Sequence, residues 1–95
     1  MEINKVKADS KLTIAPKGRI DTITSQEFAA AIEFDGIDEL LFDLSSVDYI
    51  SSAGLRVLLS AQKKMARKVM QITGAQPAVK EVFDITGFSD IFTFV

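Results

Sequence analysis

Two adjacent serines, Ser51 and Ser52, are the residues of this sequence with the clearest chemical potential. They lie between a predicted loop and a predicted helix, and the first turn of a helix carries unpaired N–H groups and a partial positive charge. A phosphate attached to a serine there is electrostatically tolerated. Ala53 and Gly54 follow, and both are small enough for a kinase or another protein to approach closely. Ser52 is also a good helix N-cap; the residues alone favour that simpler role, which is compatible with phosphorylation.

The absence of histidine and cysteine excludes the common kinds of catalytic and metal site. Without an imidazole no Ser-His-Asp or Cys-His nucleophile can form, and zinc sites of the His or Cys type are excluded as well. Carboxylate or Ser-Lys chemistry remains formally possible, but no pairing of residues calls for it. We therefore expect a protein that works by binding another protein and not as an enzyme, with no cofactor and no metal.

Length and charge narrow the choice of partner. The chain has 95 residues, 47% of them hydrophobic, which fits one domain over residues 1–95 that buries its own core. A net charge of −2 argues against nucleic acid as the direct ligand. No apolar run approaches the about 20 residues that span a bilayer, and the N-terminus has no apolar signal core. We expect no membrane contact and a cytoplasmic location.

The N-terminal region predicts a hairpin of two short strands. Residues 3–8 and 11–15 are the candidate strands, and the second alternates apolar with polar side chains. The Asp-Ser pair between them is typical of a turn. Pro16 and Gly18 are expected to end the second strand.

A helix is expected to start at Thr24 and to run to about Phe34. Thr24 and Glu27 have the spacing of a capping box, in which each side chain satisfies a free backbone N–H group. Ile23 and Phe28 stand where a hydrophobic staple forms.

The second half of the chain predicts a parallel β-α-β unit. Residues 40–44 are nearly all apolar, as in a central strand covered on both faces. A loop follows, then a helix over residues 53–68 with apolar side chains at three- and four-residue spacing, then a strand over residues 69–73. The remaining predicted elements are a helix from Pro77 that Gly87 ends and a short strand over residues 91–94. The predicted fold is α/β, with a mixed sheet of four to five strands and about three helices packed mainly on one side.

Residues 50–59, Ile-Ser-Ser-Ala-Gly-Leu-Arg-Val-Leu-Leu, resemble the signature of the sulfate transporter and anti-sigma antagonist (STAS) domain. Stand-alone members of that family are the anti-sigma factor antagonists, also called anti-anti-sigma factors. The resemblance covers nearly the whole chain. Residues 18–21 look like the family's segment before the first helix, residues 42–44 are similar to its central strand, and residues 83–88 to its last helix and the exit from it.

The resemblance implies a partner-switching cycle. The unmodified antagonist binds an anti-sigma factor, itself a serine kinase of the GHKL type, and so frees a sigma factor. Phosphorylation of one serine breaks the complex, and a metal-dependent serine phosphatase resets it. The matching acceptor is Ser52, and Asp21 is implied to lie near it, where it helps to orient the kinase or the phosphatase metal. The chain departs from many members at Ser51, where they have Asp, and at Ala53, where they have Ser or Thr.

The candidate partner-binding residues form a small set around Ser52. They are Asp21, Asp48, Ser51, Ala53, Gly54 and Arg56. The predicted helix over residues 53–68 also carries five of the eleven basic residues and no acidic one, which fits a solvated face or a docking face for an acidic partner.

Three other functions compete with this expectation. A STAS subunit of a transporter or signalling scaffold would keep the fold without being phosphorylated. A phosphoaspartate receiver centred on Asp43 is disfavoured, because the chain is short and lacks an acidic pair after the first strand. A hydrolase using Ser52 lacks both a histidine and a glycine before the serine pair.

Overall fold

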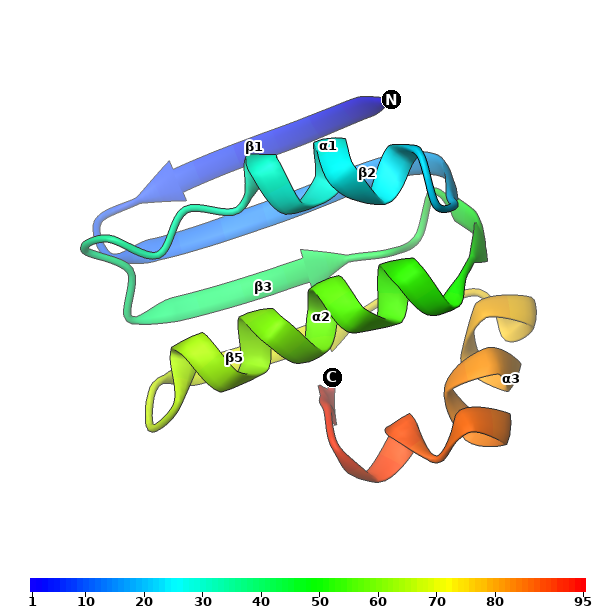
Figure 1. The fold of residues 1–95 in the computed structure, drawn as a ribbon. Coiled ribbons are helices and arrows are strands. Elements are labelled where there is room, and N and C mark those ends of the chain that lie inside the picture. The colour runs from blue at the N-terminus through cyan, green and yellow to red at the C-terminus, as the bar shows by residue number, and fades with distance from the viewer.

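A six-stranded mixed sheet forms the centre of the structure, a computed structural model that describes residues 1–95 (Figure 1). Five strands lie in the order β1-β2-β3-β5-β6, and β4 pairs with the C-terminal part of β2. β1 and β2 are antiparallel, and every other pair is parallel. The elements are β1 (Glu2–Ala8), β2 (Lys11–Ile20), α1 (Thr24–Ala31), β3 (Glu39–Asp43), β4 (Val47–Ile50), α2 (Ser52–Met65), β5 (Val69–Thr73), α3 (Pro77–Thr86), the 3₁₀ helix η1 (Phe88–Asp90) and β6 (Thr93–Phe94).

The predicted hairpin is confirmed, but its second strand is twice as long as expected. β2 has ten residues and continues through Pro16 and Gly18. Its pairing with β3 ends at Ile14 and its pairing with β4 begins at Gly18, so between them β2 has no partner on that side. A proline therefore costs no hydrogen bond there. Gly18 has φ of +98°, and the register shifts between it and Arg19, which is how β2 turns from one partner to the next.

β4 lies in a segment that the sequence predicted to be a loop. Its four residues have a buried first and last side chain, Val47 and Ile50, and two exposed ones between them. A run this short has no period-2 pattern to recognise, and it becomes a strand because β2 extends far enough to pair with it. The sheet therefore has six strands and not four to five.

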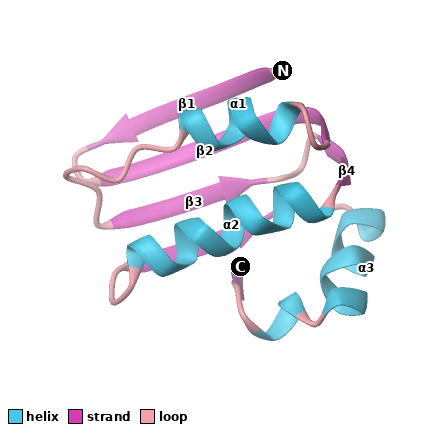
Figure 2. Ribbon diagram, viewed as in Figure 1, coloured by secondary structure: helices cyan, strands magenta, loops and turns pink.

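α1 and α2 cover one face of the sheet, and α3 lies at its end beside β4 (Figure 2). The core between sheet and helices consists of nineteen buried apolar residues. Phe28 of α1 meets Phe42 of β3 edge to face at 5.5 Å, which fixes α1 over the centre of the sheet.

The helix limits differ from the predicted ones mainly at their ends. α1 ends at Ala31, three residues before the predicted end, and α2 runs from Ser52 to Met65 and not from 53 to 68. α3 begins with Pro77, and Gly87 ends it with φ of +78°, as predicted. No helix has the length and apolar character needed to cross a bilayer.

Candidate functional site

The candidate site lies where β2 and β4 end side by side. Ile20 and Ile50 are register partners, and the Ser51 N–H donates to the Ile20 carbonyl oxygen at 2.8 Å. This bond extends the ladder by one residue past β4. It brings Asp21, which follows β2, to the same edge as the serine pair.

Ser51, and not Ser52, is the N-cap of α2. Its backbone is extended, and its hydroxyl oxygen accepts from the Gly54 N–H at 3.3 Å. Its carbonyl oxygen accepts the first helical bond, from the Leu55 N–H at 3.0 Å. The interpretation of Ser52 as the capping residue is wrong, because the cap position is already filled. Ser52 is the first residue of the helix, and it is exposed.

Arg56 lies one turn along α2 from Ser52 and is the basic group in contact with it. Its Nε donates to the Ser52 carbonyl oxygen and its Nη2 to Ser52 Oγ, both at 3.4 Å. Both residues are exposed, so the pair is weak. The contact nevertheless sets a guanidinium within reach of any group attached to Ser52 Oγ.

Asp21 organises the turn that leads into α1. Its Oδ1 accepts from the backbone N–H groups of Ile23 at 3.0 Å and Thr24 at 2.9 Å. The hydrogen bonds from the Thr24 backbone N–H and hydroxyl hold the pKa of Asp21 below its usual range. The Asp21 carboxylate is thus held in its ionised form in a turn that starts at the same sheet edge as the serine pair; its role toward a kinase or phosphatase stays a prediction.

The predicted capping box and hydrophobic staple at α1 are both wrong. Thr24 is the first helical residue, and the N-cap residue Ile23 makes no side-chain cap bond. Asp21 captures the free N–H groups instead, while Glu27 binds the N-terminal amine of Met1 at 2.8 Å. Ile23 is 75% exposed, so it cannot staple the helix start.

Gly54 faces the sheet and not a partner. It is buried, and a Cβ built on it would lie 2.7 Å from both Ile20 Cγ2 and Ile50 Cγ1. The predicted direct contact of a partner with Gly54 is therefore contradicted. The missing side chain lets the first turn of α2 pack closely on the ends of β2 and β4.

The exposed side chains of the turn before α1, of β4 and of the first turn of α2 are together called the Ser52 surface. Two of them, Ile23 and the 40% exposed Tyr49, were not among the partner-binding residues predicted from the sequence. The Arg19 guanidinium lies over the Tyr49 ring, 4.3 Å from its centroid. No local pattern in the sequence marks Tyr49, because β4, whose exposed positions it shares with Asp48, is a strand only through its pairing with β2. The Ser52 surface consists of Ile23, Asp48, Tyr49, Ser52, the half-buried Ala53 and Arg56.

Comparisons with known proteins agree with this fold. The family model for the STAS domain matches residues 2–95. BtrV of Bordetella bronchiseptica, named as an anti-sigma factor antagonist, is 36% identical over 98 residues, covering 97% of this chain and 84% of BtrV. The anti-sigma factor antagonist SpoIIAA in its unphosphorylated form has a TM-score of 0.84 at 14% identity, covering 99% of this chain and 88% of SpoIIAA. The phosphorylated form of the Bacillus cell fate determinant SpoIIAA has a TM-score of 0.74 at 13% identity, covering 99% and 91%. At these identities the two structural likenesses concern the fold alone.

Proposed function

This chain belongs to the STAS domain family, and we propose that it acts as an anti-sigma factor antagonist controlled by phosphorylation of Ser52. Its unphosphorylated form binds an anti-sigma factor that is a GHKL-type serine kinase, and a sigma factor is released. The kinase transfers phosphate to Ser52 and the complex breaks. A metal-dependent serine phosphatase restores the binding form, and the chain itself carries out no catalytic step.

The observation that carries this proposal is that the two serines have different structural roles. Ser51 holds the helix cap, so the Ser52 hydroxyl is exposed and has no structural task beyond a weak contact with Arg56. A kinase can phosphorylate this hydroxyl without unfolding the first turn of α2. SpoIIAA, whose fold is similar to that of this chain, has been solved in a phosphorylated form, which supports the proposal that this fold can carry a phosphate.

A phosphate on Ser52 would break the complex by charge and bulk and leave the domain folded. It brings about −1.5 to −2 charges, which the helix start favours by about 0.3–1 kcal/mol. In a docked interface the phosphate would have to lose its water. Arg56 offers one positive charge against about −1.5 to −2 on the phosphate, so part of the charge would be buried unpaired, at a cost of several kcal/mol. Because each factor of ten in affinity is about 1.4 kcal/mol, we expect a loss of about two decades or more.

The Ser52 surface supplies the contacts for the unphosphorylated complex. Ile23 and Tyr49 are apolar and aromatic anchors of the kind that dominate interfaces. Asp21 and Ser51 act behind them by holding the two turns that present the surface. Asp48, Ala53 and Arg56 are proposed to contact the partner directly.

The test combines phosphorylation with binding. The purified anti-sigma factor kinase of the same organism is incubated with the chain and MgATP, and the phosphate is located by peptide mass spectrometry. We expect one phosphate, on Ser52. Ser52→Ala should bind constitutively and Ser52→Asp should lose part of the affinity, measured by calorimetry. A main site at Ser45, Ser46 or Ser51 would refute the assignment, and capture of a transport ATPase without phosphorylation would favour a transporter subunit instead.

Nuclear magnetic resonance spectra distinguish a local from a global mechanism. Amide shifts on phosphorylation should be confined to residues near 48–58 and to the Asp21 turn. Shifts spread over β1, β3 and β5 would mean that the domain rearranges, and the local mechanism would be wrong.

A further inference from the structure

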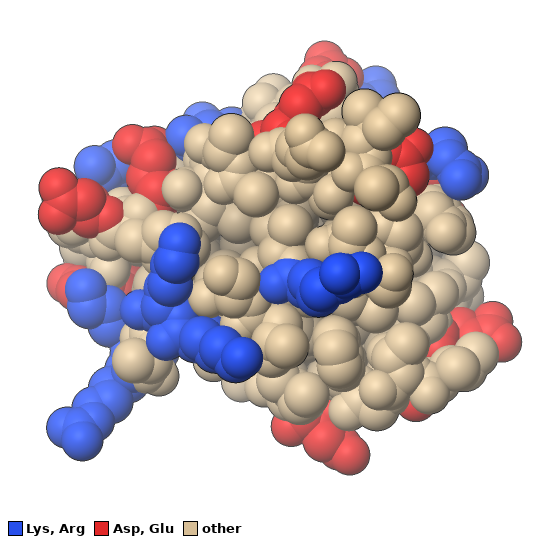
Figure 3. Space-filling view, viewed as in Figure 1, with Lys and Arg blue, Asp and Glu red and all other residues tan.

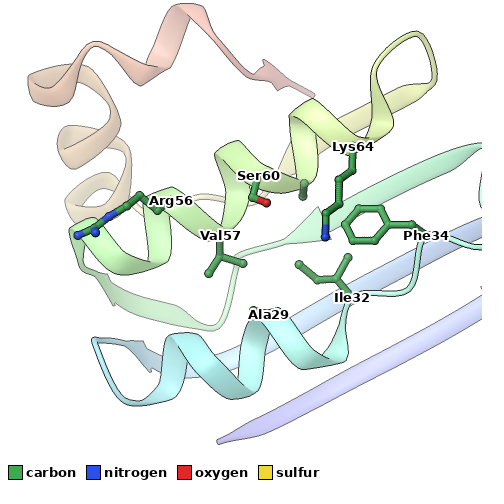
Figure 4. A pocket seen from close by; sticks show the side chains of 8 residues that line it. Ala29, Ile32, Phe34, Arg56, Val57, Ser60 and Lys64 are labelled. Carbon is green, nitrogen blue, oxygen red and sulfur yellow. The ribbon is translucent and has the colours of Figure 1, made fainter.

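A groove lies between α1 and α2, on the face of the molecule that the two helices cover (Figure 4). Its volume is about 240 Å³, and five of its eight lining residues are hydrophobic. Small side chains open it, because Ala29 of α1 and Ser60 of α2 are exposed and lie where larger residues would close the gap. Its apolar walls are Ala29, Ile32, Phe34, Val57 and Ala61.

The two ends of this groove carry positive charge. Arg56 and Lys64 stand at opposite ends, and Lys64 Nζ lies 4.9 Å above the Phe34 ring (Figure 4). Neither takes part in any of the four salt bridges of the chain. Figure 3 shows basic side chains over α2, with acidic ones toward the rim of this face. α2 itself contains no acidic residue, so neither cation has a carboxylate partner on its own helix.

The size of the groove favours side chains of a protein over a cofactor. Pockets for drug-sized ligands measure about 300–1,000 Å³, and this one is smaller. One or two apolar side chains from a partner would fill it. Arg56 and Lys64 are eight residues apart, which along a helix is about 12 Å, so the complementary carboxylates must be separated by a similar distance.

The groove is continuous with the Ser52 surface, because Arg56 belongs to both. Resting on the function proposed above, we propose that the groove between α1 and α2 is a second docking site for the anti-sigma factor. It receives one segment of that partner, with an apolar side chain flanked by two carboxylates. Arg56 joins the two contacts, since a phosphate on Ser52 would draw its guanidinium away from the partner's carboxylate.

The test fills the groove and compares a matched control. Ala29→Leu adds a side chain that projects into the groove, whereas Ala30→Leu makes the same change on an exposed residue of α1 that does not line it. Both positions are exposed and leucine is a good helix former, so both variants should fold. We expect Ala29→Leu to weaken binding of the purified anti-sigma factor kinase about tenfold and Ala30→Leu to leave it nearly unchanged.

Two charge-reversal variants make the same comparison at the Lys64 end of the groove. Lys64→Glu and Lys63→Glu change the net charge equally, but only Lys64 lines the groove. We expect the KM of the kinase for Lys64→Glu to rise about tenfold with kcat kept, and a much smaller rise for Lys63→Glu. Equal effects of the two charge changes would mean long-range attraction and would overturn the docking site.

The outcomes separate this inference from the proposed function. If all four variants bind and are phosphorylated like the wild type, the groove is refuted while the Ser52 function stands. If the wild type neither binds the kinase nor is phosphorylated, both are refuted. If the free chain forms a dimer that Ala29→Leu disrupts in sedimentation, the occupant is a second copy and the inference is wrong.

Discussion

Replacing Gly54 by alanine adds one methyl group at a point where α2 lies very close to the sheet. The new Cβ would be 2.7 Å from Ile20 Cγ2 and from Ile50 Cγ1. Carbon atoms pack best at about 3.5–4.0 Å, so each contact is short by about 0.8 Å or more. Both isoleucines are fully buried, and β-branched side chains are stiff at χ1, so neither can turn away cheaply.

The expected result is a net loss of stability. Overpacking of this kind costs about 1–3 kcal/mol, and two simultaneous short contacts favour the upper half of that range. Alanine recovers at most about 1 kcal/mol as a better helix former than glycine. The difference leaves about 1–2 kcal/mol of destabilisation, or a fall in Tm of about 5–10 °C for a chain of this size.

Urea unfolding followed by circular dichroism measures this change. The midpoint should fall while the m-value stays constant, since the exposed area on unfolding is the same. Ala53→Gly is the control, because it measures the alanine-to-glycine difference one residue away in the same turn. If Gly54→Ala is as stable as the wild type or more so, the close packing of α2 on Ile20 and Ile50 is not real and the reasoning fails.

Three further predictions concern the neighbouring residues. Ser51→Ala should lose about 0.5–2 kcal/mol of stability, measured by thermal unfolding, because it removes the cap bond to Gly54, whereas Ser52→Ala should change stability little; equal losses would contradict the cap assignment. Because the pKa of Asp21 is lowered on folding, its ionised carboxylate stabilises the fold above the unfolded pKa of about 3.9, and this stabilisation is lost as the pH falls through the folded pKa. The difference in Tm between wild type and Asp21→Asn should therefore narrow below about pH 4. A difference that stays constant with pH would show that the charge of Asp21 does not matter. In phosphorylated protein, Arg56→Ala should raise the second pKa of the Ser52 phosphate, about 6 when unperturbed, in a ³¹P titration; an unchanged value would show that Arg56 does not reach the phosphate.

Elements that are marked by their own residues could be predicted from the sequence. The apolar run of β3 and the Pro77 and Gly87 limits of α3 need no distant partner to be recognised. β4 could not be found in this way, because Val47–Ile50 is a strand only through its pairing with the far end of β2. That end of β2 was itself hidden by Pro16, which is tolerated in the strand because neither β3 nor β4 pairs with β2 at this point.

The same non-local pairing explains which parts of the site were predicted. The serine pair and its helix-start position are visible in the sequence, but either serine could serve as a cap. The choice depends on where β4 ends, since the Ser51 N–H continues the ladder to Ile20 and leaves Ser51 extended. Gly54 was misread for a related reason: a small residue looks alike in a sequence whether it faces a partner or the protein's own core.

The pairing of β2 with β4 thus determines how the Ser52 hydroxyl is presented. It ends the extended backbone at Ser51, which makes Ser51 the cap and Ser52 the first helical residue. It also sets Ile20 and Ile50 under Gly54, so the first turn of α2 is anchored on both sides of Ser52. A group added to Ser52 Oγ therefore meets Arg56 and solvent and no part of the core. The charge on Ser52 can therefore change at little cost to the stability of the fold, because the first turn of α2 is held by Ser51 and Gly54 and not by Ser52.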